Sequence, residues 1–139
     1  MYNRIASFAL VVKDYDEAID FYVNKLGFDL IEDTVLSPAK RWVQVAPKGA
    51  KECTILLAKA SSEIQEKCIG HQTGGRVGFF MFTDDFDREY TRITQNGVEI
   101  VRPPVTETHG KVAVFKDLYG NQWDLIEPTV VNKGLSIAP

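Results

Sequence analysis

The side chains best suited to proton transfer in this sequence are its two histidines, His71 and His109. An imidazole changes charge near neutral pH and can both accept and donate a proton. His71 lies in the glycine-rich segment Gly70–Gly75, where we expect an exposed loop residue. His109 lies in a loop before an apolar run, and two interpretations stay open: an exposed loop residue, or a hydrogen-bonding or acid–base group. We identify no nucleophile or carboxylate as its neighbour in the sequence.

Other residues of chemically active types fit structural roles better. Cys53 and Cys68 are too few for a disulfide framework, and we expect inert thiols. Gly74-Gly75 lacks the Gly-x-x-x-x-Gly-Lys pattern of a phosphate loop. The acidic run Asp84-Asp85-Phe86-Asp87 looks like a metal site, but it falls at a predicted helix start, where carboxylates cap the backbone and complement the helix dipole.

The elements that position these residues occur twice. Tyr15, Ile19 and Tyr22 are spaced four and three apart, which predicts one apolar stripe on a helix that ends at Gly27. The same residue types recur 71 positions later. Phe86, Tyr90 and Ile93 repeat the apolar stripe, Asp85 repeats the acidic residue Asp14 before the helix, and Gly120 repeats the turn glycine Gly49. Because one offset links a helix and a later turn, we infer an internal duplication.

Apolar runs of strand length surround both helices. Each half therefore consists of a strand, a helix and three strands, which defines an α+β fold. The predicted strands are Ile5–Val12, Phe28–Val35, Arg41–Val45, Thr54–Ala58, Arg76–Thr83, Val98–Val101, Lys111–Phe115 and Gln122–Glu127. Pro103-Pro104 is expected to interrupt regular structure before the seventh strand. We expect a first module over 1–60, a linker with a short helix and a glycine-rich hinge over 61–75, a second module over 76–127 and a tail over 128–139.

Two stretches resemble a known family. Residues 11–22 with Leu26-Gly27-Phe28 are similar to the helix motif of the vicinal oxygen chelate superfamily, and residues 115–125 are similar to its Gly-Asn hairpin, with Leu118 in place of the usual proline. That superfamily includes glyoxalase I, extradiol dioxygenases, fosfomycin-resistance enzymes and bleomycin-binding proteins. The resemblance runs from about Arg4 to Glu127, and it implies two βαβββ modules that form a cup-shaped half-barrel sheet in one glyoxalase-like domain.

The resemblance also implies where a divalent metal would bind. Metal-dependent members place one ligand on the first strand and one on the last strand of each module. These positions fall on Ser7, Leu56, Gly78 and Asp124, of which only Asp124 is a competent carboxylate ligand. One carboxylate does not make a tight metal site. We therefore expect no metal and no other cofactor.

Strand alternation then gives the side chains of the expected cup. The predicted ligand pocket is mostly apolar, with scattered polar groups, and consists of Ser7, Trp42, Leu56, Arg76, Gly78, Phe80, Phe82, His109, Gln122 and Asp124. The opposite faces, including Phe8, Leu10 and Val12, are expected to pack under the helices. An alternative stays open, in which Phe80, Phe82 and Trp42 fill the cup as core. The His109-Gly110 pair resembles a segment that overhangs the cleft in several members, so His109 and Asp124 are the catalytic candidates.

Composition narrows the function classes. The chain has 139 residues, 45% hydrophobic and 25% charged, with a formal net charge of −3, which offers no basic face for nucleic acid. No apolar run approaches the roughly 20 residues of a membrane span, and the first residues lack a signal peptide, so we expect a cytoplasmic protein. Three functions are weighed: a metal-free binder of a small apolar or aromatic molecule, which we favour; a glyoxalase- or dioxygenase-type enzyme with a displaced metal or a metal-free mechanism; and a protein-association module. The resemblance further implies a homodimer.

Overall fold

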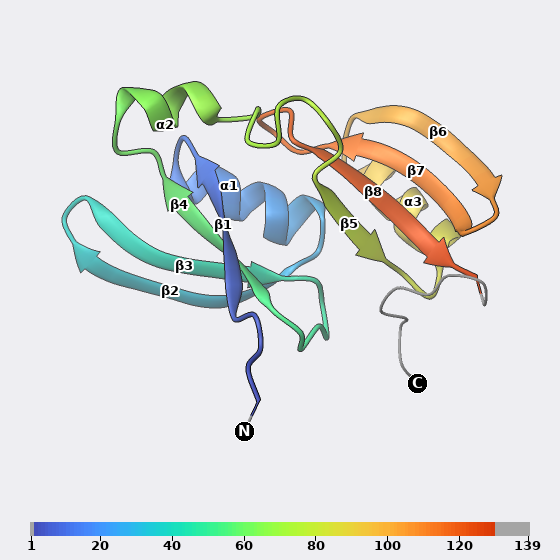
Figure 1. Cartoon of the computed structure of the whole chain (residues 1–139), viewed down its shortest axis with the longest axis horizontal. Coiled ribbons are helices and arrows are strands. Elements are labelled where there is room, and N and C mark those ends of the chain that lie inside the picture. The colour runs from blue at the N-terminus through green and yellow to red at the C-terminus, as the bar shows by residue number, and fades with distance from the viewer. Residues whose placement is uncertain (1, 130–139) are drawn as a thin grey trace. The chain divides into compact units, whose positions relative to one another are not determined.

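Each half of the chain folds as a four-stranded mixed sheet with a helix packed on one face (Figure 1). The computed structural model describes residues 2–129, so the predicted tail lies, from residue 130 onward, outside the described residues. Two compact units divide between Gln72 and Thr73, and we call the residues before and after this point unit 1 and unit 2.

The order of elements is the same in the two units. Unit 1 consists of β1 (Ser7–Val12), α1 (Tyr15–Ile19) continued by the π-helical turn η1 (Asp20–Lys25), β2 (Asp29–Ser37), β3 (Lys40–Ala46), β4 (Thr54–Lys59) and a short helix α2 (Glu63–Cys68). Unit 2 consists of β5 (Phe79–Phe82), α3 (Phe86–Gln95), β6 (Ile100–Glu107), β7 (Gly110–Lys116) and β8 (Gln122–Pro128).

The strand orders β1-β4-β3-β2 and β5-β8-β7-β6 are equivalent under the duplication. In each sheet the first and last strands of the module pair in parallel, and the remaining neighbours are antiparallel. The α+β fold with two βαβββ modules predicted from the sequence is therefore confirmed.

The duplication extends to side-chain contacts on the helices. In unit 1 the guanidinium of Arg41 lies 2.9 Å from Asp16 and covers the ring of Tyr15 at 5.2 Å. In unit 2 a lysine 70 positions later pairs with an acid at 2.7 Å and covers an aromatic ring at 5.0 Å, the three residues being Lys111, Asp87 and Phe86. A cation held by both an acid and an aromatic face thus attaches each helix to its sheet.

Acidic residues begin both of the long helical segments, as predicted. The carboxylate of Asp14 accepts a hydrogen bond from Glu17 N at 2.9 Å, and that of Asp85 accepts one from Arg88 N at 3.2 Å. The capping interpretation of the acidic run at 84–87 is therefore confirmed for Asp85, which uses its carboxylate on the first turn of α3.

Two local expectations were wrong. Regular structure continues through Pro103 and Pro104, which lie within β6. β6 is an edge strand, and its pairing with β7 shifts register between Arg102 and Val105, so neither proline has to donate a ladder hydrogen bond. Phe8 is 59% exposed although the same-face residues Leu10 and Val12 are fully buried, so the buried part of this face of β1 begins only after Phe8.

Candidate ligand-binding site

A row of side chains crosses the face of the unit 2 sheet that lies away from α3. We call this the open face because Phe80 at one end of the row is 56% exposed, although Val114 within the row is buried. The register places Phe80 of β5 opposite Asp124 of β8, Asp124 opposite Val114 of β7, and Val114 opposite Arg102 of β6. Residues paired in this way point to the same face of a sheet. The neighbours of Asp124 along β8, Trp123 and Leu125, are buried on the other face, so the row faces away from the core under α3.

A second row beside the first is apolar. It consists of Phe82, Ile126, Val112 and Val105, again in register across the four strands. Part of the two rows and the β6–β7 turn enclose a cavity of about 380 Å³, lined by Arg102, Pro103, Val105, Glu107, His109, Val112, Ala113, Val114 and Asp124. The lining combines apolar side chains with four polar or charged ones, and small-molecule sites combine both kinds of group.

Asp124 is the central polar group of this cavity. Burial raises the pKa of its carboxyl, and the positive charges of Arg102 and His109 only partly oppose that shift, while Glu107 adds to it. Among residues 2–129, no donor hydrogen-bonds to the Asp124 side chain. The carboxyl is therefore partly desolvated without an internal partner, which is the state expected of a group that meets a ligand.

His109 has a carboxylate neighbour after all. Its Nδ1 lies 3.6 Å from Oε2 of Glu107, two residues earlier in the chain, and both side chains are about half exposed. The expectation that no carboxylate adjoins His109 was wrong, because the tight β6–β7 turn brings Glu107 opposite Gly110 and folds the two side chains together. His109 also lines the cavity with Asp124, so the structure brings both catalytic candidates together.

The other site residues predicted in unit 2 lie on or beside the same face. Phe80 is 56% exposed, so within unit 2 it does not belong to the core. Phe82 is half-buried in the second row, and Gln122, also half-buried, lies opposite Lys116 at the start of β8. Gly78 N donates to Gln122 O at 3.1 Å, and Arg76 lies before the strand with its Nε donating to Val77 O at 3.0 Å.

The remaining predicted site residues belong to unit 1. Ser7 pairs with Thr54 on adjacent parallel strands, and Leu56 is opposite Gln44 of β3. Trp42 is 36% exposed on β3. Whether they share one ligand with the residues of unit 2 stays a prediction.

The residues at the four family metal positions do not fit a metal. Leu56 and Gly78 offer no side-chain donor atom, and Ser7 offers a neutral hydroxyl. Within residues 2–129, no three side chains among His, Cys, Asp and Glu come together in a way that could hold a metal ion. We derive no chemical step through a metal at Asp124.

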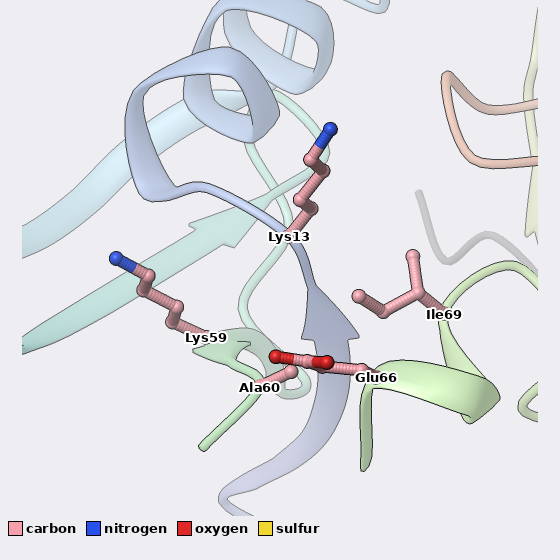
Figure 2. A pocket seen from close by; sticks show the side chains of 5 residues that line it. All are labelled: Lys13, Lys59, Ala60, Glu66 and Ile69. Atoms are coloured by element: carbon pink, nitrogen blue, oxygen red, sulfur yellow. The ribbon is translucent and has the colours of Figure 1, made fainter. Parts of the chain in front are cut away.

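A second cavity, of about 390 Å³, lies in unit 1 between the ends of β1 and β4 and the helix α2 (Figure 2). Its polar groups are Lys13, Lys59 and Glu66, and the two lysine side chains extend in different directions. Both lysines are exposed, so this cavity lacks a desolvated polar anchor like Asp124.

Arg102 and Glu107 were missed as site residues. The sequence predicts a turn at Arg102-Pro103-Pro104, which places Arg102 outside the sheet. A signal was present in the continuous apolar run at 112–115, which is typical of a strand buried on both faces and therefore paired with a neighbouring strand.

With this fold and site described, comparison with known proteins identifies the family. The chain belongs to the Glyoxalase/Bleomycin resistance protein/Dioxygenase superfamily, whose model matches residues 4–125. An uncharacterized protein of Shewanella frigidimarina (strain NCIMB 400) is 56% identical over 128 residues, which cover 91% of this chain and 95% of that protein.

Two solved structures are similar over nearly their whole length. The crystal structure of UcmS2 has a TM-score of 0.80 at 30% identity and covers 91% of this chain and 99% of that one. TnmS3, described as an antibiotic binding protein from Streptomyces sp. CB03234, has a TM-score of 0.74 at 32% identity, covering 92% and 98%. In the described part of this chain, no helix has the length and apolar character needed to cross a membrane.

Proposed function

We propose that this protein binds a small apolar or aromatic molecule on the open face of the unit 2 sheet, without a metal ion. The observation that carries the proposal is the pairing of Phe80, a phenyl ring that is 56% exposed, with Asp124, a carboxyl whose pKa is raised by burial. An exposed ring beside a cavity offers a stacking surface, and exposed apolar groups of this kind mark interaction sites.

The relatives support a binding role. TnmS3 is described as an antibiotic binding protein, and its fold matches this chain at 32% identity. The absence of donor atoms at Leu56 and Gly78 favours sequestration over the metal chemistry of other members. Elemental analysis of the purified protein tests the proposal that binding needs no metal ion. A stoichiometric divalent ion in the protein would refute it.

A second candidate is an enzyme of the same superfamily that acts without the usual metal. The observation in its favour is the cavity that holds Asp124, His109 and Glu107 together, with the pKa of Asp124 raised. Such groups can act as general acids and bases. Chemical change of a bound compound over time, lost in His109→Gln, would favour this candidate over binding alone.

The assembly and the location are also proposals. We propose that two chains form a homodimer, that the protein acts in the cytoplasm, and that nucleic acid is not its partner. The family resemblance supports the first, and the net charge of −3 supports the last. Analytical ultracentrifugation tests the dimer, which a monomer at micromolar concentration would exclude.

Phe80 and Phe8 make a matched pair for testing the site. Their exposures are 56% and 59%, so replacing either by alanine should hardly change stability. Phe80→Ala is expected to weaken binding of 1-naphthalenemethanol about tenfold, because a stacked ring contributes about 1 to 1.5 kcal/mol. Phe8→Ala should leave the affinity within twofold. Isothermal titration calorimetry measures both, and equal losses in the two variants would refute a site at Phe80.

A further inference from the structure

The open face of unit 1 is the sheet face that carries Glu32, Gln44 and Leu56, and its polar groups are paired differently from those of unit 2. In unit 1 the carboxylate of Glu32 accepts hydrogen bonds from Thr34 Oγ1 at 2.9 Å and from Gln44 Nε2 at 3.1 Å. Thr54 Oγ1 in turn donates to Gln44 Oε1. Both Glu32 oxygens are therefore engaged by the unit's own residues, and this face satisfies its carboxylate internally.

The equivalent row in unit 2 lacks such donors. Val114 stands 70 positions after Gln44 and has no polar side-chain atom, while Asp124 occupies the strand position that Leu56 has in the first module. No described residue donates a hydrogen bond to Asp124. Unit 2 thus has a carboxylate at this position without a neighbouring amide to pair with it, which leaves Asp124 available to a donor from outside the chain.

The charges around Asp124 favour a cation as that donor. Two carboxylates, Asp124 and Glu107, line the cavity together with the guanidinium of Arg102 and the imidazole of His109. Arg102 lies on β6, two strands away from β8, whereas Phe80 lies on β5 at the other side of Asp124. A cation bound between Phe80 and Asp124 would contact both the carboxylate and the aromatic face. It would also lie on the side of Asp124 opposite to the positive charge of Arg102.

We propose that Asp124 anchors a protonated amine carried by an aromatic ligand whose ring lies against Phe80. This inference rests on the proposed function and adds the charge of the ligand to it. An ammonium supplies the hydrogen bonds that Asp124 lacks, and charge-assisted hydrogen bonds of this kind are about twice as strong as neutral ones.

Three naphthalenes that share one ring system and differ in one group separate the charge preference from aromatic binding: 1-naphthylmethylamine, 1-naphthalenemethanol and 1-naphthoate. Isothermal titration calorimetry at pH 7 is expected to show the amine binding about tenfold more tightly than the alcohol, and the naphthoate binding most weakly. Asp124→Asn, which is nearly isosteric, should remove the amine's advantage while leaving alcohol binding within twofold. Glu32→Gln, a carboxylate change on the open face of unit 1, should leave all three affinities unchanged.

Acidification provides an independent check. The amine should lose affinity as pH falls through the raised pKa of Asp124, since the neutral carboxyl attracts an ammonium weakly. His109, Glu107 and Arg102 also face Asp124 and are present in both proteins, so the wild type should show a steeper loss than Asp124→Asn, which lacks only the carboxyl of Asp124.

The three naphthalenes distinguish failure of the ammonium proposal from failure of the proposed aromatic binding. Equal binding of amine and alcohol, or tightest binding of the naphthoate, overturns the ammonium proposal and leaves aromatic binding standing. An amine preference that survives in Asp124→Asn also overturns it. Failure of all three naphthalenes to bind overturns both this inference and the proposed function.

Discussion

Replacement of Gly110 by alanine is expected to destabilise the protein by about 3 kcal/mol or more. Gly110 begins β7 with φ at +146°, a conformation that residues with a side chain rarely adopt. A Cβ at this position would lie 2.2 Å from the carbonyl oxygen of Glu127 and 3.1 Å from Cα of Pro128. These are backbone atoms of the paired strand β8, so no side-chain rotation relieves the overlap and the β7–β8 ladder itself has to move.

Gly49→Ala is the matched control for that prediction. Gly49 also has a positive φ, +81°, but a Cβ there meets no atom within 4 Å. Its replacement therefore carries only the conformational penalty, about 1 to 2 kcal/mol. Urea unfolding followed by far-UV circular dichroism measures both variants, and equal free-energy losses would contradict the close approach of Gly110 to Glu127.

The second large effect is expected at Asp117. Its carboxylate, in a residue only 5% exposed, accepts hydrogen bonds from the backbone N–H groups of Tyr119 and Asn121, both at 2.9 Å, and from Asn121 Nδ2 at 2.8 Å. This side chain holds the turn that connects β7 to β8, the two strands that carry Val114 and Asp124. Asp117→Ala leaves buried donors unsatisfied and is expected to cost about 3 kcal/mol.

Asp117→Asn and Asp84→Ala are the control variants for the loss of stability expected in Asp117→Ala. The asparagine keeps one acceptor oxygen for the backbone N–H groups, so about half of the loss should return. Asp84 is exposed and makes one ion pair, 3.6 Å from Arg88, so its removal should cost less than about 0.5 kcal/mol. Chemical denaturation ranks the three variants. An Asp117→Ala variant as stable as Asp84→Ala would show that the turn does not depend on the buried carboxylate.

Much of the fold follows from local patterns in the sequence. The spacing of Tyr15, Ile19 and Tyr22, the acidic caps and the glycines at helix ends each depend on a few neighbouring residues, and their recurrence at an offset of 71 predicted two equivalent modules. The placement of Phe80 and Asp124 on one face also followed, because strand alternation is local once the register is fixed.

The features that were missed depend on how neighbouring strands pair, which the pattern within one strand does not show. Pro103 and Pro104 are compatible with a strand only because β6 is an edge strand with a register shift, and that depends on β7. Arg102 was therefore excluded from the site. The contact between His109 and Glu107 depends on how tightly the β6–β7 turn closes. The lack of a donor for Asp124 becomes visible only when Val114 is seen opposite it.

The central claim is that an aromatic ligand binds the open face of the unit 2 sheet. A titration of ¹⁵N-labelled protein with 1-naphthalenemethanol, followed by ¹H–¹⁵N correlation spectra, tests it most directly. The account predicts saturable shifts centred on the amides of Phe80, Val114 and Asp124, with the Phe8 amide unaffected. Shifts centred on unit 1, or no saturable shifts at millimolar probe, would contradict it.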